Sequence, residues 1–213
     1  GRRGYRCRGP EGSGPVSAEY VSRNIDSIRV ITANMDFNRG GDLAYIRHLR
    51  ATYSPAVLAM QERTRGRFGT RIRGLGINMR GSRRRPLGRT GSHRFAVARW
   101  VWHNGRWVRV INAHGLHRGT VGFLAQEVFL RILAAWIHRL TRRGVPWILA
   151  GDFNRHHLTV ARLMGGKGVG SGVDAVIVSP LLDVELVTVD ETALKRGWSD
   201  HPAVVARVSG RKP

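Results

Sequence analysis

Two segments of the sequence are the most informative about the fold: VPWILAGDFN, residues 145–154, and SDHPAVVARV, residues 199–208. In the first stretch an apolar run leads directly into a polar cluster, and in the second a polar cluster leads into an apolar run. Short apolar runs of this kind predict buried β-strands. Because α/β proteins build catalytic and metal sites from polar side chains at the ends of buried strands, we expect both clusters to belong to one site.

Outward from these stretches, strand and helix patterns alternate along residues 28–213, which we interpret as one domain. Strands are predicted over residues 28–32, 56–60, 95–102, 107–113, 147–150, 175–178, 184–189 and 204–208. Helices are predicted over residues 42–53, 120–142 and 159–164. The dipeptide Asn104-Gly105 favours a tight hairpin between two of the strands. Hairpins mixed with helices indicate an α+β protein with layers of helices outside layers of sheet.

Apolar residues at helical spacing predict which faces of the two longer helices are buried. The expected core residues are Leu43, Ile46 and Leu49 in the first helix, and Leu124, Val128, Ile132, Trp136 and Leu140 in the second. The arginine- and glycine-rich residues 63–94 have poor periodicity and are predicted to form a long loop, as are the glycine-rich residues 165–173. Three tryptophans of the hairpin are expected to pack across its strands: Trp100, Trp102 and Trp107.

The charge of the chain points to a polyanionic partner. Its 36 Lys and Arg residues against 14 Asp and Glu give a formal net charge of +22, nearly all of it from arginine. Arginine binds phosphates bidentately. Genome base composition is an alternative source of arginine, but it does not by itself deplete acidic residues. We therefore expect nucleic acid to be the partner, contacted through the run Arg83-Arg84-Arg85 among others.

Residues 1–27 are rich in Gly, Arg, Ser and Pro, and they predict a basic, flexible N-terminal arm that is either a linker or an electrostatic clamp on nucleic acid. The chain contains no apolar run of roughly 20 residues, so we expect no membrane partner, and no signal peptide is recognisable. The single cysteine, Cys7, excludes an intramolecular disulfide. Protein partners are not indicated.

Few residues are acidic, so their positions are informative. Asp152, Asp174, Asp200 and Glu62 each lie at the start or end of a predicted strand, as do Asn34, Asn112 and His114. A hard divalent cation such as Mg²⁺ prefers oxygen ligands, which Glu62, Asn34 and Asp200 offer. His201 offers a base that titrates near neutral pH, and a neighbouring carboxylate would fix its tautomer.

The order of these motifs resembles the endonuclease/exonuclease/phosphatase superfamily, the DNase I-like phosphoesterases. The resemblance extends over residues 28–208 and rests on Asn34, Gln61-Glu62, Asn112-Ala113-His114, the residues 151–154, Val173-Asp174 and the residues 199–201. It implies a four-layer α/β sandwich in which helices flank two central mixed β-sheets. It also implies hydrolysis of a phosphate ester with Mg²⁺, or alternatively with Mn²⁺ or Ca²⁺.

The resemblance assigns a role to each position. Glu62 would be the main metal ligand, with Asn34 and Asp200 completing or supporting the metal sphere. His201 would be the general base that activates water, oriented by Asp174.

Around the phosphate, the resemblance implies that Asp152 and Asn154 position the nucleophile and stabilise the pentacoordinate state. His114 would contact the scissile phosphate, and Asn112 would support that loop at the substrate. Arg155, directly after Asn154, and the run at residues 83–85 are the expected substrate-binding arginines.

The sequence also departs from the family pattern. Ala33 stands where Trp is frequent, and Gly115 follows His114 where Leu is common. Val173 and Ala175 flank Asp174 in place of the more usual Ile and Tyr, and the segment from residue 154 to residue 174 is short. No reacting group is lost, so these departures concern the class of substrate rather than the chemistry.

From the charge and the motifs we expect a nuclease with little sequence preference, acting on DNA rather than RNA. One alternative is a phosphatase of the same superfamily that acts on a phosphoinositide or a nucleotide. Another is a non-catalytic, basic nucleic-acid-binding protein that retains the fold. The compact size and arginine content would suit a delivered toxin or a phage-encoded nuclease.

Overall fold

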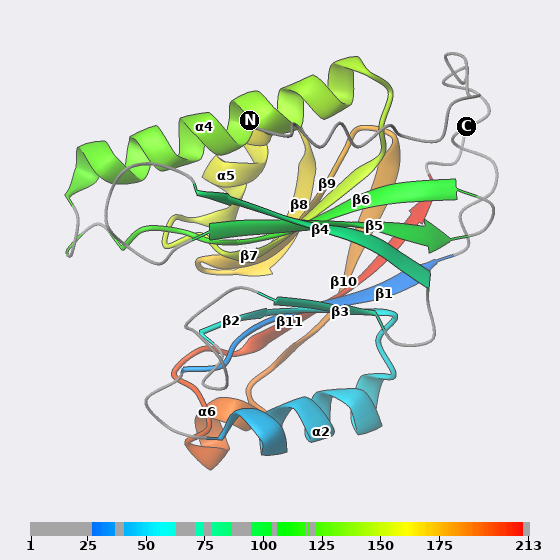
Figure 1. Cartoon of the computed structure of the whole chain (residues 1–213). Coiled ribbons are helices and arrows are strands. Elements are labelled where there is room, and N and C mark those ends of the chain that lie inside the picture. The colour runs from blue at the N-terminus through cyan, green and yellow to red at the C-terminus, as the bar shows by residue number, and fades with distance from the viewer. Residues whose placement is uncertain are drawn as a thin grey trace, which may run out of the picture.

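The computed structural model describes residues 27–36, 41–62, 71–74, 78–86, 95–103, 106–117, 119 and 122–210. Two β-sheets lie face to face at the centre of the molecule (Figure 1). Helices α4 (Phe123–Arg142) and α5 (His157–Met164) cover one sheet, and α2 (Asp42–Tyr53) and α6 (Thr192–Arg196) cover the other. The four-layer sandwich expected from the sequence is therefore confirmed. The predicted arm at residues 1–27 lies, but for its last residue, outside the described residues.

The first sheet has the strand order β10-β11-β1-β2-β3. Its strands are β1 (Ile28–Asn34), β2 (Val57–Gln61), β3 (Arg71–Gly74), β10 (Leu182–Asp190) and β11 (Ala203–Gly210). Strands β1 and β2 are parallel and place Asn34 beside Gln61. Strand β11 runs antiparallel to β1 and places Thr32 beside Val204. As a result, the ends of β1 and β2 and the beginning of β11 meet at one edge.

The second sheet has the order β4-β5-β6-β7-β9-β8. Its strands are β4 (Asn78–Pro86), β5 (Phe95–His103), β6 (Arg106–His114), β7 (Trp147–Asp152), β8 (Lys167–Ser171) and β9 (Asp174–Val178). The parallel pair β6 and β7 aligns His114 with Asp152, and the antiparallel pair β7 and β9 aligns Asp152 with Asp174. The strand register alone therefore sets three polar residues in a row.

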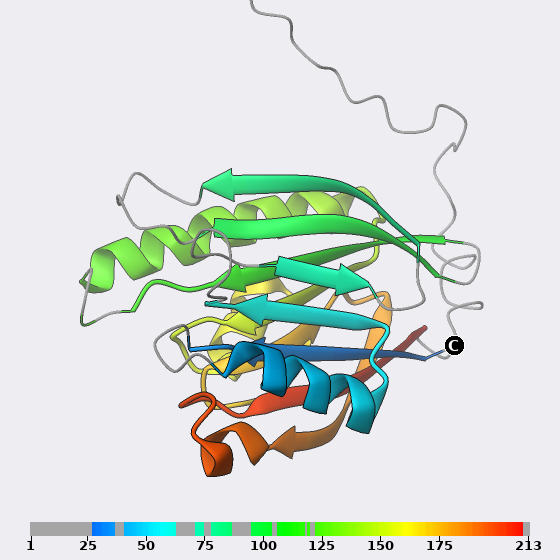
Figure 2. The ribbon, with the colours of Figure 1, turned by 60° about the horizontal axis from the view of Figure 1, so that its bottom comes forward.

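Three apolar layers hold the sandwich together. Alternation along a strand sends successive side chains to opposite faces, so Val30 packs between the sheets while Ile31 packs against the helix side. Each fully buried aliphatic or aromatic side chain contributes roughly 1.5–3 kcal/mol. Figure 2 shows α2 and α6 over the outer face of the first sheet, with α4 beyond the second sheet.

The buried faces of the two longer helices differ from those predicted. Helix α2 buries Tyr45 with Ile46 and Leu49, while Leu43 is 37% exposed. In α4 the predicted stripe is largely wrong, because Leu124, Val128 and Ile132 are exposed and Trp136 and Leu140 only partly buried; the buried apolar face is Phe129, Leu130, Leu133, Ala134 and Ile137. The five predicted residues are spaced four apart, and in a helix of 3.6 residues per turn each lies about 40° further around the axis than the one before. The five therefore spread over about 160° and cannot all face the sheet.

The prediction of a loop over residues 63–94 is also wrong in part. Strand β3 pairs with β2, and β4 pairs with β5, where a bulge separates Arg80 from Arg83. The backbone partners come from neighbouring strands, so β4 needs no hydrophobic periodicity of its own, and charged residues and a terminal Pro86 are typical of an edge strand. Residues 63–70, 75–77 and 87–94 lie outside the described part of the chain. The predicted glycine-rich loop likewise contains β8.

The pairing of the two predicted hairpin strands is confirmed as β5 and β6, and the predicted turn at Asn104-Gly105 lies outside the described residues. Trp102 lies opposite Trp107, with their rings edge to face at 5.0 Å between centroids, and Arg109 lies over Trp100 at 4.9 Å. These tryptophans pack across the strands as expected. No helix in the described ranges is long and apolar enough to cross a membrane.

Candidate active site

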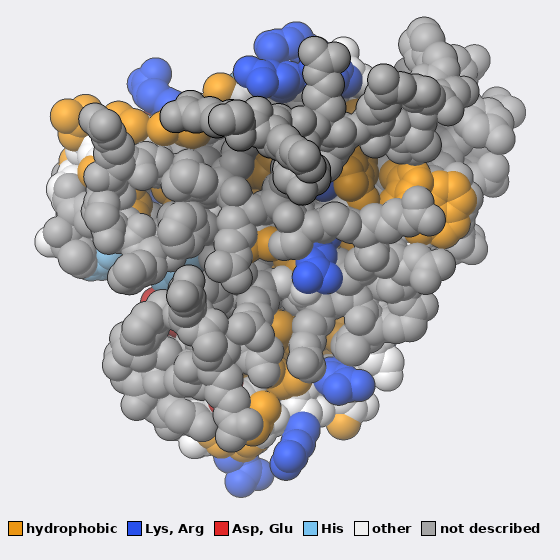
Figure 3. All heavy atoms as spheres, in the orientation of Figure 1, with side chains coloured by type: hydrophobic (Ala, Val, Ile, Leu, Met, Phe, Trp, Pro, Cys, Tyr) orange, Lys and Arg blue, Asp and Glu red, His pale blue; other side chains and the backbone are white. Residues whose placement is uncertain are grey.

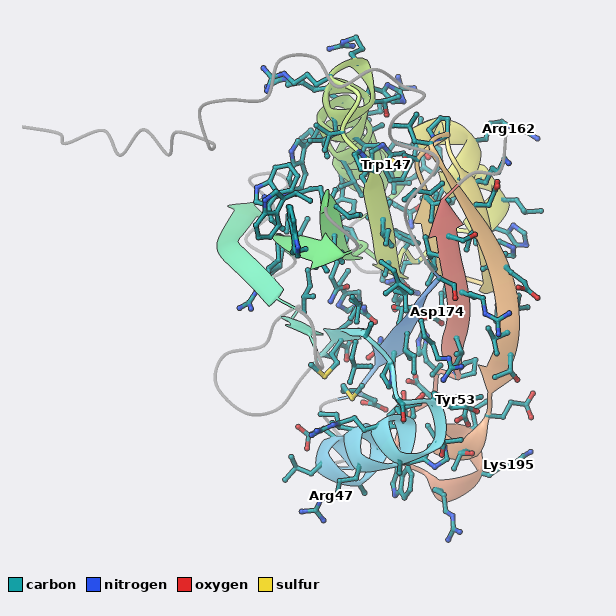
Figure 4. The ribbon with its side chains drawn as sticks, turned by 90° about the vertical axis from the view of Figure 1, so that its right-hand side faces the viewer. Arg47, Tyr53, Trp147, Arg162, Asp174 and Lys195 are labelled. Carbon is teal, nitrogen blue, oxygen red and sulfur yellow. The ribbon has the colours of Figure 1, made fainter. Side chains whose placement is uncertain are left out.

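Polar residues from both sheets converge at one edge of the sandwich. The first sheet contributes Asn34, Glu62 and the loop of residues 199–201, and the second contributes His114, Asp152 and Asp174. In Figure 3, acidic and histidine side chains come together in a hollow between the upper and lower halves, at the left of the view. Figure 4 shows the labelled Asp174 at the level where the two halves meet, between Trp147 and Arg47.

His201 and Asp174 form a hydrogen-bonded pair that joins the two sheets at this edge. The Nδ1 of His201 lies 2.7 Å from the Oδ2 of Asp174. Since a carboxylate accepts, Nδ1 carries the hydrogen and Nε2 faces away from the pair. The backbone N–H of His201 donates to Ser199 Oγ at 3.1 Å, and Ser199 Oγ donates to Asn34 O at 2.8 Å. His201 is thus held in place both by its ring and by its backbone N–H.

The electrostatics of this pair follow from its burial. Burial alone would lower the pKa of His201, but the hydrogen bond and charge of Asp174, with the charges of Asp152 and Asp200, raise it to about 9. Burial raises the pKa of Asp174 to about 6, against the hydrogen bond from His201, and the charge of Asp152 adds to the rise. Without a cation, both His201 and Asp174 therefore bind a proton more tightly than the same side chains do in water.

Asp152 is the centre of the site. It is 1% exposed, and its Oδ2 accepts from Asn34 Nδ2 at 3.1 Å and lies 3.4 Å from His114 Nε2. The same oxygen lies 3.9 Å from His201 Nε2, and the other oxygen accepts from the backbone N–H of Asn154 at 2.8 Å. Burial would raise the pKa of Asp152, but His114, His201 and the Asn154 N–H together hold it below its ordinary value.

Three residues at this edge have left-handed backbone conformations. Glu62 and Asn154 both have φ 49°, and Asp36 has φ 40°. Residues other than glycine rarely adopt this region, and such strain gathers where a site dictates the position of a side chain. Glu62, so placed directly after β2, lies with its Oε1 3.4 Å from His114 Nε2.

The carboxylates of this edge suit a hard divalent cation. Ligand atoms of Asp152, Asp174 and His201 all lie within 4.8 Å of one another and form a group that could hold a metal ion. The Oδ1 of Asp174 is buried without a hydrogen-bond partner among the described residues. The expected ligands Glu62 and Asn34 border the same space, both through contacts to Asp152 or His114. Because a hard cation prefers oxygen ligands, the oxygen donors are the better candidates for metal ligands.

Two predicted site residues sit at the margin. The side chain of Asp200 is 57% exposed, and its Oδ1 lies 3.9 Å from His201 Nε2. Asn112 is fully buried, accepts from Gln61 Nε2 at 2.6 Å and donates to Met60 O at 2.9 Å. Asn112 thus links β6 to β2 beneath the site, a position that supports the strand ends rather than one that meets a ligand.

The predicted substrate-binding arginines fall in two places. Arg155 Nη1 lies 3.4 Å from Glu127 Oε1, and its guanidinium lies 5.7 Å from the Phe123 ring centre. The register of β4, β5, β6 and β7 sets Arg85, Ala96, Ala113 and Gly151 in line, so residues 83–85 lie at the same end of the sheet as the site. Two strand spacings separate β4 from β6, which is about 10 Å.

Sequence reasoning missed several residues of this edge. Asp36 is buried, and its backbone N–H donates to Asn34 Oδ1 at 3.0 Å. Ser199 lay within a recognised motif but received no role, and its bonds show that it joins β1 to His201. Gln126 of α4 contacts two of the site loops. A carboxylate two residues after Asn34 was a usable signal for Asp36, whereas nothing in the sequence pattern marked Gln126.

The glycine after His114 has a steric reason. A Cβ on Gly115 would overlap the carbonyl group of Phe153, and a Cβ on Gly151 would overlap the carbonyl oxygen of Ala113. The Gly115 N–H also donates to Asp152 O at 2.6 Å. The departure from the family's usual Leu therefore permits β6 and β7 to approach closely at the site.

No protein-family model matches the sequence, and no curated protein matches it. Solved structures do share its fold. A humanized D. rerio TDP2 with 14 mutations is 16% identical, with TM-score 0.67 over 86% of this chain and 99% of that chain. The endonuclease/exonuclease/phosphatase from Bacteroides vulgatus is 16% identical, with TM-score 0.65 over 87% and 100%. The human Nocturnin catalytic domain with bound sulfate is 17% identical, with TM-score 0.65 over 87% and 94%. The chain therefore has the DNase I-like fold of the endonuclease/exonuclease/phosphatase proteins.

Proposed function

We propose that this chain is a divalent-cation-dependent phosphoesterase that hydrolyses phosphodiester bonds of nucleic acid, DNA before RNA, with little sequence preference. The observation that carries the proposal is the convergence of the hydrogen-bonded pair His201–Asp174 with Asp152, from two different sheets, at one strand edge. A buried, oriented imidazole beside several carboxylates suits metal-assisted attack of water on a phosphate.

In this proposal each side chain has a task that its geometry permits. His201 Nε2 takes the proton as the water oxygen bonds to phosphorus and the bond to the leaving oxygen breaks. Asp174 holds the tautomer and stabilises the imidazolium that forms, in the manner of the carboxylate of a catalytic triad. His114, whose Nε2 lies 3.4 Å from Asp152 Oδ2, would donate to the phosphate. Asn154, whose backbone N–H donates to Asp152 Oδ1, would donate the second hydrogen of its Nδ2.

Glu62, Asn34 and Asp152, with Asp200 at the rim, would hold the cation. A bound Mg²⁺ would supply Lewis-acid polarisation of the phosphate and offset the charge that develops in the transition state. It would also counter the carboxylates that raise the pKa of His201, which favours the neutral imidazole that a base must be.

The charge of the chain supports nucleic acid as the substrate. A net charge of +22 suits a polymer that offers many phosphates, whereas a small phosphorylated metabolite needs few contacts. Residues 83–85 at the site end of β4, and Arg155 beside Asn154, supply candidate phosphate contacts. Among structures with this fold, D. rerio TDP2 has been solved in complex with single-strand DNA product.

One assay compares the three functions that the sequence leaves open. The purified chain is incubated with supercoiled plasmid, RNA and phosphoinositide in Mg²⁺, with EDTA and His201→Ala as controls. Nicking of plasmid that both controls abolish is the expected result. Release of phosphate from phosphoinositide alone would favour the phosphatase alternative. Retardation of plasmid without cutting, unchanged in His201→Ala, would overturn the proposal in favour of a binding protein.

A further inference from the structure

Helix α4 places a polar side chain on its buried face. Gln126 is 1% exposed and lies one turn before Phe129 and Leu130 of the apolar core. Its Nε2 donates to Leu116 O at 3.0 Å and to Asn154 O at 2.7 Å. A single amide therefore joins the loop after β6 to the loop after β7.

Both loops carry residues of the candidate site. Leu116 lies two residues beyond His114, and Asn154 lies two residues beyond Asp152. The loops are also joined directly, because Asn154 Nδ2 donates to Gly115 O at 3.1 Å. Gln126 thus closes a small network whose other members are backbone groups of the two loops and the Asn154 amide.

The network fixes Asn154 in an unfavourable conformation. Its φ of 49° lies in the left-handed region, which costs about 1–3 kcal/mol unless the surroundings impose it. The backbone N–H of Asn154 bonds to Asp152 Oδ1, its carbonyl accepts from Gln126, and its Nδ2 bonds to Gly115 O. In the Asn154 side-chain amide, these bonds leave Oδ1 and the second hydrogen of Nδ2 for a ligand.

The orientation of the Gln126 amide is determined by its partners. Carbonyl oxygens only accept, so Nε2 has to face both of them and a flipped amide is excluded. Its Oε1 is then buried with no hydrogen-bond partner in the described part of the chain. An unpaired buried acceptor costs about 1–3 kcal/mol, so an apolar side chain at this position would avoid a penalty that glutamine carries.

We infer that Gln126 is a positioning residue for the proposed hydrolysis: it holds the Asn154 and His114 loops in the register that the reaction needs, and this rests on the proposed function. Because the hydrogen bonds of Gln126 go to backbone carbonyls of the two loops and not to a proposed reacting group, its loss should affect turnover more than binding. A misplacement of about 1 Å in a reacting group lowers the rate on the order of 100-fold.

The test uses two variants that remove the donor and one matched control. Gln126→Met keeps length and burial without an N–H, and Gln126→Glu keeps the shape but sets an acceptor against both carbonyls. Thr141→Val removes a side-chain bond at the other end of the same helix, where Thr141 Oγ1 accepts from Trp147 Nε1 at 2.9 Å. Each variant is compared with the wild type by thermal melting, kcat and KM.

The expected result is a fall in kcat of about 10- to 100-fold in Gln126→Met, with KM within about threefold. Thr141→Val should lower the melting temperature and leave kcat unchanged. Equal kcat in Gln126→Met and the wild type, or equal losses of kcat in Gln126→Met and Thr141→Val, would overturn the inference. Gln126→Glu should lose at least as much kcat as Gln126→Met; if it does not fold, Gln126→Met decides alone.

A second readout separates this inference from the proposed function. In ¹⁵N-edited NMR spectra, the side-chain amide resonances of Asn154 should shift in Gln126→Met and stay in place in Thr141→Val. Unshifted resonances in Gln126→Met would overturn the positioning role whatever the activity. If the resonances shift in Gln126→Met but the wild type cleaves no phosphate ester, the proposed function is overturned. The hydrogen-bond network around Gln126 is then still supported.

Discussion

Two histidine–carboxylate pairs in this molecule have the same length and different surroundings. His201 Nδ1 lies 2.7 Å from Asp174 Oδ2, and His48 Nε2 lies 2.7 Å from Asp190 Oδ2. The first pair joins the two sheets at the candidate site, whereas the second joins α2 to the end of β10 on the outer side of the first sheet. Distance alone therefore does not distinguish a candidate catalytic pair from a structural one.

The difference lies in what else surrounds each carboxylate. The second oxygen of Asp190 accepts from the Thr192 N–H at 2.7 Å at the start of α6. Although burial opposes it, the hydrogen bonds from Thr192, His48 and Tyr53 hold the pKa of Asp190 below its ordinary value. The second oxygen of Asp174 has no hydrogen-bond partner among the described residues, and burial raises the pKa of Asp174 to about 6. Asp190, with both oxygens hydrogen-bonded, has the surroundings of a structural carboxylate. Asp174, with one buried oxygen unpaired among the described residues, has those of a carboxylate that could bind a cation or a proton.

The largest difference between the pairs should appear in turnover. Asp174→Asn removes the negative charge that holds His201 in its tautomer and stabilises the imidazolium, and we expect kcat to fall about 10²- to 10⁴-fold while nucleic-acid affinity changes little. Asp190→Asn should keep kcat within about threefold and lower the free energy of unfolding by about 1 kcal/mol, because a helix-end bond and the His48 contact weaken. Steady-state cleavage and urea unfolding measure both; equal losses of turnover in the two variants would erase the distinction.

The next effect is the stabilisation of the folded chain by a divalent cation. A cation that binds only the folded chain stabilises it by about 2.7 kcal/mol at 100 times its Kd. We expect millimolar Mg²⁺ to raise the melting temperature of the wild type and of Asp190→Asn, and to raise it much less in Glu62→Gln. Asp183→Asn is the control, since Asp183 is a surface carboxylate that pairs with Lys167. A rise of the same size in Glu62→Gln would place the cation elsewhere.

A smaller effect concerns charges near each pair. Arg155 follows Asn154 at the site, whereas Lys195 lies on α6, close in sequence to Asp190, and pairs with Glu191. The logarithm of the affinity falls linearly with the logarithm of the salt concentration. If Arg155 contacts a phosphate, Arg155→Ala should make this negative slope shallower by about 1, and Lys195→Ala should leave it unchanged. Fluorescence anisotropy with a labelled oligonucleotide over a salt series measures both slopes. Identical slopes in the two variants would remove Arg155 from the binding surface.

A further expected effect is the pH dependence of stability. The fold raises the pKa of His201 from 6.5 to about 9, so it favours the protonated imidazole. That stabilisation is fully present below about pH 6.5 and is lost as the pH rises through about 9. Without divalent cations, the difference in melting temperature between the wild type and His201→Gln should therefore shrink over this window. A difference that stays constant would mean that Asp174 does not hold a proton on His201.

The sequence predicts the strand ends that form the site, because each short polar cluster adjoins an apolar run. The register of the strands then places the polar residues of neighbouring strands side by side. His114, Asp152 and Asp174 share one line across β6, β7 and β9 for this reason. The strand β4 could not be found, since its pairing depends on β5 and its own pattern is that of a charged loop. The buried face of α4 was misplaced because apolar residues occur on more than one side of that helix.

The supports of the site were less accessible to sequence reasoning than its reacting groups. Ser199 and Asp36 act through bonds to Asn34, which depend on how the loop of residues 199–201 meets the end of β1. Gln126 binds carbonyl groups of two loops that lie 10 and 28 residues from it in the sequence. Such contacts follow from tertiary structure, and a residue type alone does not signal them.

We propose that the His201–Asp174 pair, and not the His48–Asp190 pair, drives metal-dependent cleavage of a phosphodiester. The most direct measurement is single-turnover cleavage of an end-labelled DNA in Mg²⁺ by His201→Ala and His48→Ala, each with its folded fraction determined by circular dichroism. We expect His201→Ala to lose at least about 10²-fold in rate. His48→Ala should cleave at nearly the wild-type rate per folded molecule, and EDTA should stop its cleavage. Cleavage by His201→Ala at the wild-type rate would overturn the proposed role of the His201–Asp174 pair.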